Sequence, residues 1–289
     1  MSRVGFVGLG VMGGPMASHV LSGGFELAVW NRTPEKTEAL ARRRVEVAPD
    51  LESLGASCDR VFLCVTRTED VRECLAALTR RARPGTLFVD HSTISPTAAI
   101  EIHGELGAEG FAFVDAPITG GSAGAQRGSL TIFCGGSEAN VRAAMPVLNT
   151  YARRAERVGG PGAGQMMKMA NQIAVGGALL GLCESLSFAA KAGLDLKQAH
   201  ELIGSGAAGS WAFENYGPMI LAEDWRPGFS VANQLKDFGY VREAAQAIDA
   251  ATPGTATVDR LLKRLADEGH GDWTTAGLFD AMRRMGFDE

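Results

Sequence analysis

The start of the chain constrains the fold most, because a glycine-rich turn stands between an apolar run and a helical segment. The run Val4–Val7 predicts a buried strand, and the helical segment extends from Pro15 to Leu21. Between them lies Gly8-Leu9-Gly10-Val11-Met12-Gly13, with GxGxxG spacing. In this context Gly8 allows a tight turn, Gly10 lets the backbone approach a pyrophosphate, and Gly13 permits close packing of helix on strand. We therefore predict that residues 8–13 bind a dinucleotide at a helix N-terminus.

Short β-rich runs alternate with helical segments through the first half of the chain. Several runs are apolar throughout, which is typical of parallel strands buried on both faces. The alternation predicts right-handed βαβ units and a doubly wound, Rossmann-type α/β sheet. The predicted strands are Val4–Val7, Leu27–Trp30, Val61–Val65, Leu87–Asp90, Phe111–Asp115 and Leu130–Cys134, with a weaker one at Val45–Val47.

After Val158 the pattern changes, and no further strand is predicted. Gly159-Gly160-Pro161-Gly162 interrupts the chain, and the proline-free segment 165–192 then predicts one long helix. Further helices are expected at 196–204, 211–222, 232–247, 255–268 and 274–284. We therefore predict a Rossmann-type cofactor domain at 1–162 and an all-α substrate and dimerisation domain at 163–289, with the long helix joining them.

The end of the second predicted strand bears on which nicotinamide cofactor is bound. Enzymes selective for NAD place a carboxylate there, against the ribose 2′-hydroxyl. Here the strand is followed by Asn31-Arg32-Thr33, and Glu26 lies at its other end. Arg32 offers a guanidinium to a 2′-phosphate, with Asn31 and Thr33 as hydrogen-bonding groups. Such a contact contributes about 1.5–3 kcal/mol, which predicts NADPH over NADH by roughly ten- to a hundredfold. The alternative is that Arg32 is an exposed turn residue.

One face of the long helix carries a lysine and two amides. Lys168, Asn171 and Gln172 stand at i, i+3 and i+4, so they share that face. Their neighbours are apolar or small, and we expect partial desolvation to lower the pKa of the lysine from about 10.4 toward neutral pH. Such a lysine suits a proton donor and acceptor. The alternative is a lysine that reaches water from a core helix.

Two further loops follow predicted strands and are expected above the same edge of the sheet. One is 90–96, and the other is 115–122, whose glycines can present backbone N–H groups to an anion. Each is either a binding loop or a plain connection. His91 has no acidic partner motif, so its predicted role is hydrogen bonding within the loop.

Composition argues against several classes of protein. Hydrophobic residues make up 46% and charged residues 21%, and the net charge of −5 disfavours nucleic acid or a membrane surface as partner. The five cysteines form no CxxC pair and the five histidines no HxxxH pair, so no metal site is predicted. The chain enters a strand almost at once, and its longest apolar run has eleven residues, Ile173 to Cys183. We therefore expect no signal peptide, no membrane span and a cytoplasmic location.

With these motifs in order, the chain resembles the β-hydroxyacid dehydrogenase family, close to the 3-hydroxyisobutyrate dehydrogenase and the glyoxylate/succinic semialdehyde and tartronate semialdehyde reductase types. The resemblance covers nearly the whole chain. Residues 4–13 resemble the family's cofactor motif, 115–121 its substrate loop and 164–172 its catalytic helix. Gln234-Leu235-Lys236-Asp237 resembles the segment whose lysine reaches the cofactor and whose aspartate lies near the substrate.

The resemblance implies an NADP(H)-dependent oxidoreductase that interconverts a small semialdehyde or oxo acid and the corresponding hydroxy acid. Lys168 would be the catalytic lysine, and the substrate would lie between the two domains. The implied substrate-binding residues are Thr119, Gly120, Gly121, Asn171, Gln172, Phe229 and Asp237. The implied cofactor-binding residues are Gly8, Leu9, Gly10, Val11, Met12, Gly13, Asn31, Arg32, Thr33, Val65, Thr66, Thr93 and Lys236.

Two departures from the family pattern affect the implied substrate contacts. Some members carry asparagine four residues after the lysine, whereas here Gln172 stands there and Asn171 precedes it. Which amide contacts substrate therefore stays open. Thr119 stands where many members have serine. The identity of the acid and the direction of flux are also not determined by these motifs.

Lys168 weighs against two other functions. Imine reductases of this architecture replace the lysine, and non-catalytic cofactor-binding modules lack it. Two alternatives remain, a non-catalytic cofactor-binding module and a reductase of a bulkier ketone or imine. The second would have Trp211, Phe213 and Trp225 around a larger pocket, although ordinary packing is the favoured role for these aromatic residues. The apolar, small-residue-rich second domain predicts a homodimer or homotetramer.

Overall fold

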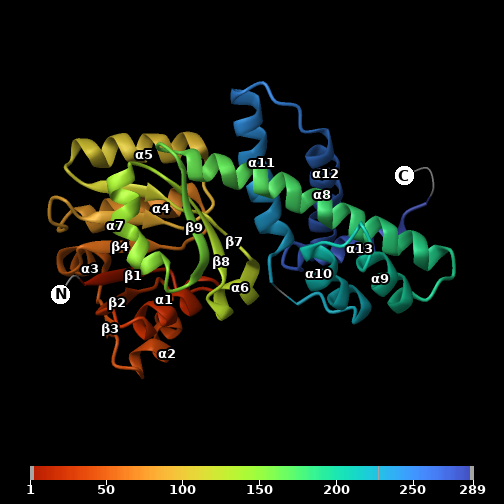
Figure 1. Cartoon of the computed structure of the whole chain (residues 1–289), viewed down its shortest axis with the longest axis horizontal. Coiled ribbons are helices and arrows are strands. Elements are labelled where there is room, and N and C mark those ends of the chain that lie inside the picture. Colours follow the sequence, from red (N-terminus) through yellow and green to blue (C-terminus); the bar gives the residue numbers. More distant parts are fainter. Residues whose placement is uncertain (1–2, 227, 287–289) are drawn as a thin grey trace. The chain divides into compact units, whose positions relative to one another are not determined.

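The computed structural model describes residues 3–226 and 228–286 and divides into two units, Met1–Lys168 and Met169–Glu289 (Figure 1). A helix of 29 residues, α8 (Ala163–Lys191), belongs to both. The sequence-based boundary at residue 162 precedes this helix, whereas the units divide inside it, after Lys168. The reason is that the first turns of α8 make hydrogen bonds to two strands of the first unit, at Asp115 and Ile118.

The first unit is built on one sheet of nine strands. They are β1 (Val4–Val7), β2 (Leu27–Trp30), β3 (Glu46–Val47), β4 (Arg60–Leu63), β5 (Leu87–Asp90), β6 (Ala112–Asp115), β7 (Ile118–Thr119), β8 (Leu130–Gly135) and β9 (Ala152–Gly159). The order is β3-β2-β1-β4-β5-β6-β8-β7, and β9 also pairs with β8. Strands β1 to β6 are parallel, so their carboxyl ends lie along one edge of the sheet.

Helices cover both faces of this sheet, as the doubly wound prediction requires. They are α1 (Gly13–Ser22), α2 (Glu38–Ala41), α3 (Leu51–Ser57), α4 (Thr68–Thr79), α5 (Pro96–Ala108), α6 (Gly121–Arg127) and α7 (Glu138–Leu148). On β1, Val4 and Phe6 join a core cluster with α1 and α7, whereas Val7 joins another with α3, α4 and α5. Because successive side chains of a strand point to opposite faces, an all-apolar strand contributes to both cores.

The sheet differs from the prediction at its far edge. β8 runs antiparallel to β6 and to β7, and the strands β7 and β9 were not predicted. β9 has the sequence Ala-Arg-Arg-Ala-Glu-Arg-Val-Gly, whose side chains are exposed or half-buried, so it lacks the apolar pattern of an interior strand. β7 has only two residues, too few to show any period.

The second unit is helical. It contains α9 (Leu196–Gly204), α10 (Trp211–Leu221), α11 (Val231–Ala247), α12 (Pro253–Leu265) and α13 (Leu278–Arg284), with short turns at Ala266–His270 and Thr275–Gly277. Its core packs Leu182 and Leu186 of α8 against Phe213, Phe238 and Leu262. Among residues 169–226 and 228–286 the structure has no strand apart from one isolated bridge, Ser230 to Thr274, which agrees with the predicted all-α domain.

The outer face of α8 is apolar and exposed within the single chain. Met167, Ile173 and Phe188 are 43%, 38% and 74% exposed. Judged by length and composition alone, α8 could cross a membrane, and no other helix in the described part of the chain meets that criterion. The sequence analysis expected no membrane span, because the uninterrupted apolar run from Ile173 to Cys183 is too short to cross a membrane. Core helices of soluble proteins pass the same test.

Candidate active site

The glycine loop after β1 has the geometry that its spacing predicts. Gly8 has φ +90°, and a Cβ atom there would lie 2.3 Å from the carbonyl oxygen of Cys64. A Cβ atom at Gly13 would lie 1.9 Å from the carbonyl oxygen of Gly8, so helix and loop touch at that point. At Gly10 a Cβ atom would meet nothing within 4 Å. The protein itself therefore excludes side chains at Gly8 and Gly13, and the backbone at Gly10 is open to a pyrophosphate.

A cavity of about 180 Å³ lies beside this loop, within the first unit. The predicted cofactor residues that line it are Gly8, Gly10, Asn31, Arg32, Thr33, Val65 and Thr66. The structure thus brings together residues from the carboxyl ends of β1, β2 and β4. Lys36 also lines this cavity and was missed by the sequence reasoning. The sequence feature that could have indicated Lys36 is its position four residues after Arg32, in the short helix Pro34–Thr37.

Asn31 and Arg32 have different surroundings at this cavity. The Asn31 side chain accepts a hydrogen bond from the Leu9 N–H at 2.8 Å and donates one to the Thr33 carbonyl at 2.8 Å, so it fixes the two loops to each other. The Arg32 guanidinium lies 3.4 Å from Asp70, and its side chain is 80% exposed. An exposed ion pair of this kind contributes little and leaves the guanidinium available to a stronger anion.

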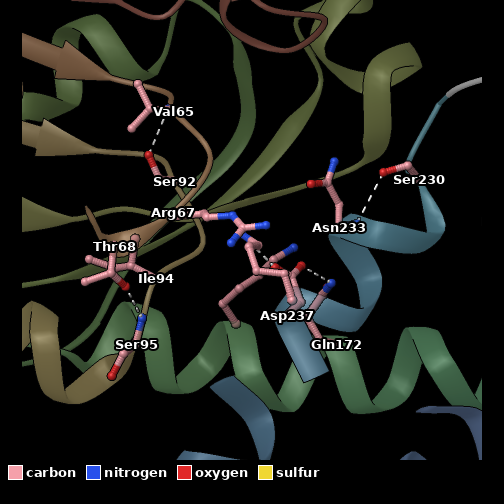
Figure 2. Close-up of polar contacts among 12 residues, drawn as sticks. Val65, Arg67, Thr68, Ser92, Ile94, Ser95, Gln172, Ser230, Asn233 and Asp237 are labelled. Carbon is pink, nitrogen blue, oxygen red and sulfur yellow. Dashed lines mark hydrogen bonds and ion pairs between the residues drawn. The ribbon is translucent and has the colours of Figure 1, made fainter. Parts of the chain in front are cut away.

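The loops after β4 and β5 are connected to each other by hydrogen bonds from backbone to side chain. The Ser92 hydroxyl accepts from the Val65 N–H at 2.9 Å, and the Thr68 hydroxyl accepts from the Ser95 N–H at 3.3 Å (Figure 2). Thr93, predicted to line the nicotinamide side, is half-buried between Ser92 and Ile94. The two loops predicted to contact the nicotinamide therefore form one connected layer.

His91 has a structural role, which agrees with the predicted hydrogen bonding. It is buried, with Nδ1 2.7 Å from the Ala116 carbonyl oxygen and Nε2 2.9 Å from the Tyr151 hydroxyl. Burial lowers the pKa of His91 to about 4, so the ring is neutral at pH 7. Nδ1–H then donates to the carbonyl, and Nε2 accepts from the tyrosine.

Lys168 is buried in the first unit beside the predicted carboxylate loop. Lys168 is only 7% exposed, and its Nζ donates a hydrogen bond to the Ile118 carbonyl at 2.8 Å. Ile118 directly precedes Thr119, Gly120 and Gly121, and both glycines have positive φ, +124° and +64°. The structure therefore places an ammonium group next to a turn whose N–H groups can face an anion.

The start of α8 is fixed by a buried carboxylate. Asp115, fully buried at the end of β6, accepts hydrogen bonds from the Gly162 and Gln165 N–H groups, each at 2.9 Å. Gly162 directly precedes α8 and Gln165 lies in its first turn, and N–H groups at the start of a helix have no partner within it. A carboxylate at a helix N-terminus is also favoured by the helix dipole. Sequence reasoning placed Asp115 in the substrate loop and did not recognise this role.

In the second unit, the two amides of α8 and the Lys236-Asp237 pair of α11 form a hydrogen-bonded chain. Gln172 donates to Asp237 at 2.7 Å (Figure 2). Asn171 donates to Gln172 at 2.9 Å, and Lys236 lies 3.0 Å from Asp237. Gln172 and Asp237 are buried, whereas Asn171 is half-buried. Phe229, half-buried just before α11, accepts from the Thr275 N–H through its carbonyl.

The aromatic residues considered for a larger pocket make packing contacts within the second unit. Phe213 is buried in the core, and Trp225 stacks on Trp273 with ring centroids 5.8 Å apart. Trp211 is 42% exposed and meets Tyr216 edge-on. Over the described residues, no group of three or more His, Cys, Asp or Glu side chains is arranged to hold a metal ion.

Two protein families match the chain in succession. Residues 3–160 match the family described as the NAD binding domain of 6-phosphogluconate dehydrogenase. Residues 162–282 match the family described as NAD-binding of NADP-dependent 3-hydroxyisobutyrate dehydrogenase. Together they cover both structural units.

Full-length relatives show the same similarity. An Arabidopsis thaliana protein, probable 3-hydroxyisobutyrate dehydrogenase-like 1, mitochondrial, is 36% identical over 98% of this chain and 86% of its own. The 2-hydroxy-3-oxopropionate reductase of Escherichia coli is 33% identical over 98% of each chain. The structure of Mycobacterium tuberculosis 3-hydroxyisobutyrate dehydrogenase with L-serine superposes with a TM-score of 0.88 and 30% identity, over 98% of this chain and 99% of that chain.

Proposed function

Because this chain belongs to the β-hydroxyacid dehydrogenase family, we propose that it interconverts a small semialdehyde or oxo acid and the corresponding hydroxy acid, with NADP(H) as cofactor. The observation that carries the proposal is the position of Lys168. Its buried ammonium group donates to the Ile118 carbonyl, directly before the anion-binding turn Thr119–Gly121. A proton donor and a carboxylate-binding turn side by side are what reduction of an aldehyde acid requires.

The cofactor would be held by the glycine loop and by the cavity beside it. Gly8 to Gly13 would contact the pyrophosphate, and Val65, Thr66 and Thr93 would line the nicotinamide side. Arg32 is our proposed ligand of a 2′-phosphate, with Lys36 as a second cation at the same cavity. The nicotinamide, when bound, supplies or accepts the hydride.

The residues of the chain then position the substrate and move the proton. Backbone N–H groups of Thr119, Gly120 and Gly121 would orient the substrate carboxylate. Lys168 would protonate the alkoxide oxygen that develops during reduction, and would take the proton back as a base during oxidation. Its bond to Ile118 restricts where the ammonium group points before reaction, so little reorganisation is needed. The remaining substrate contacts proposed from the family pattern are Asn171, Gln172, Phe229 and Asp237.

The first test is a panel of substrates with each cofactor. Purified protein would be assayed with glyoxylate and with succinic, methylmalonate and tartronate semialdehydes, following NADPH and NADH consumption. We expect turnover of at least one of them, with kcat/KM for NADPH roughly ten- to a hundredfold above that for NADH. Equal efficiency with NADH would contradict the proposed role of Arg32. Tight NADPH binding without turnover of any of the four would contradict the proposed substrate class.

We also propose that a second copy of the chain covers the exposed face of α8. Phe188 is 74% exposed, and it lines a groove of about 770 Å³ together with Gly181, Leu194 and Leu202. A Cβ atom at Gly177 or Gly181 would meet nothing within 4 Å, so another helix can approach this face closely. Apolar faces of this extent on a soluble protein mark interaction sites.

Phe188→Glu is therefore expected to shift the protein toward monomer, because it places a charge in an apolar interface. Sedimentation equilibrium of the wild type and the variant at matched concentrations measures the shift. Ile248→Glu is the control, since Ile248 is 61% exposed and lies just after α11, away from the groove residues in sequence. A monomeric wild-type protein, or partition of the wild type into lipid vesicles, would contradict a second copy as the occupant.

A further inference from the structure

We infer that Gln165 is a positioning residue, which fixes the distance between Lys168 and the loop that carries Thr93. This inference rests on the proposed function, because it assigns Lys168 the proton and Thr93 the nicotinamide side. Gln165 does not need to touch substrate or cofactor for this role. It acts through the residues that it holds.

The first observation is a two-point clamp made by the Gln165 side chain. The residue is fully buried, its Nε2 donates to the Ser92 carbonyl at 2.8 Å, and its Oε1 accepts from the Ile94 N–H at 3.2 Å. Those two backbone groups flank Thr93 on either side. A buried primary amide has both a donor and an acceptor, so glutamine satisfies both backbone groups at once. Removing one member leaves a buried polar group unsatisfied.

The second observation is that the backbone of Gln165 is itself immobilised. Its N–H donates to the buried Asp115 carboxylate at 2.9 Å. A Cβ atom at Gly164 would lie 2.4 Å from the Phe133 carbonyl oxygen and 2.5 Å from that of Asp115. The first turn of α8 therefore packs directly on β6 and β8. Side chain and backbone together tie this turn to three separate segments of the sheet's edge.

The third observation is the proximity of Lys168 along the helix. Gln165 and Lys168 are three residues apart on α8, so they lie one above the other on neighbouring turns. A shift or rotation of the turn at Gln165 therefore displaces the Lys168 ammonium from the Ile118 carbonyl. On the other side, the Ser92 hydroxyl accepts from the Val65 N–H (Figure 2). The clamp thus connects both proposed nicotinamide loops to the helix that carries the proton donor.

The chemical consequence concerns kcat rather than binding. Hydride and proton must be delivered to the two atoms of one carbonyl group, so the donor groups must keep a fixed separation. A misplacement of about 1 Å costs on the order of a hundredfold in rate. Substrate carboxylate binding at Thr119–Gly121 does not use the clamp. We therefore expect loss of the clamp to lower kcat and to leave KM almost unchanged.

The test compares Gln165→Met, which keeps the volume and removes both hydrogen bonds, with the wild type. We expect kcat to fall roughly ten- to a hundredfold and KM to stay within about threefold. The primary deuterium isotope effect with 4-deuterated NADPH should increase as the chemical step becomes limiting. Without cofactor or substrate, hydrogen–deuterium exchange at the Ile94 amide should accelerate, because that N–H loses its acceptor.

Two further variants make the outcome decisive. Val141→Ala removes buried methyl groups from the core on α7 and is expected to lower the unfolding temperature with kcat unchanged. Gln165→Glu keeps the acceptor for the Ile94 N–H but replaces the donor to the Ser92 carbonyl with an oxygen, so it breaks one of the two hydrogen bonds. It is the variant to use if Gln165→Met does not fold. Wild-type kcat and isotope effect in a folded Gln165 variant, with Ile94 exchange accelerated, would overturn the inference. A fall in kcat that only matches the loss of folded protein would overturn it as well.

The same series separates this inference from the proposed function. Lys168→Ala is assayed in parallel with the Gln165 variants. If Lys168→Ala loses turnover and folded Gln165→Met does not, only the positioning role fails. If Lys168→Ala retains turnover, the proposed role of the lysine fails, and with it the premise of the clamp.

Discussion

Replacing Lys168 by alanine is expected to lower kcat by roughly a hundred- to ten-thousandfold, the range for loss of a positioned acid–base group. The ammonium group is buried and bonded to the Ile118 carbonyl, so bulk water has poor access to that position as a substitute proton donor. The dissociation constant for NADPH should change little, because the glycine loop and its cavity lie elsewhere in the unit. Steady-state assays and fluorescence titration of NADPH measure the two quantities separately.

Lys191 offers a matched control on the same helix. It lies in the last turn of α8, is exposed, and donates to the Met285 carbonyl. Lys191→Ala should therefore retain wild-type kcat. A Lys168→Ala enzyme with wild-type kcat and bound NADPH would show that another group delivers the proton.

The second large effect is expected at Gly13, where alanine should weaken NADPH binding by at least ten- to a hundredfold, about 1.4–2.8 kcal/mol. The added Cβ would lie 1.9 Å from the Gly8 carbonyl oxygen and 3.2 Å from the Phe6 ring. Helix α1 must therefore move away from the loop that we propose binds the pyrophosphate. Titration of intrinsic fluorescence with NADPH measures the affinity, and thermal unfolding measures the accompanying loss of stability.

The neighbouring glycine distinguishes steric conflict from a general effect of mutation in this loop. A Cβ atom at Gly14 would meet the Leu9 carbonyl oxygen at 3.5 Å, which is ordinary contact. Gly14→Ala should therefore leave the affinity for NADPH unchanged. Because alanine has a higher helix propensity than glycine, this substitution should also stabilise the protein by about 0.5–1 kcal/mol. Equal losses of affinity in Gly13→Ala and Gly14→Ala would contradict the packing role assigned to Gly13.

Local patterns in the sequence predicted much of the fold. The buried strands β1, β2 and β5 begin and end where their apolar runs do, and α9 spans 196–204 as predicted. A strand that is buried on both faces has an uninterrupted apolar run, and an amphipathic helix has apolar residues with a period of about 3.6 residues. Both patterns can be recognised in a short stretch of sequence. The charged strand β9 and the two-residue strand β7 leave no such pattern, and the reversed direction of β8 depends on pairing between distant segments.

The candidate site divides in the same way. The sequence by itself predicted the glycine loop, because the order of strand, turn and helix and the spacing of Gly8, Gly10 and Gly13 are contained in one short segment. It also determined the family and the presence of a lysine on a long apolar helix. Only the tertiary structure decided what that lysine touches, since Ile118 is 50 residues away in the chain.

The structure likewise decided the roles of Asp115 and Gln165, whose partners lie 47 to 73 residues away. Such contacts form because strand ends and a helix N-terminus meet at one edge of the sheet. No local pattern in the sequence indicates which strand ends lie next to which helix N-terminus. Chain folding brings together polar groups that each segment would otherwise leave buried and unsatisfied, and their pairing fixes the helix that carries Lys168.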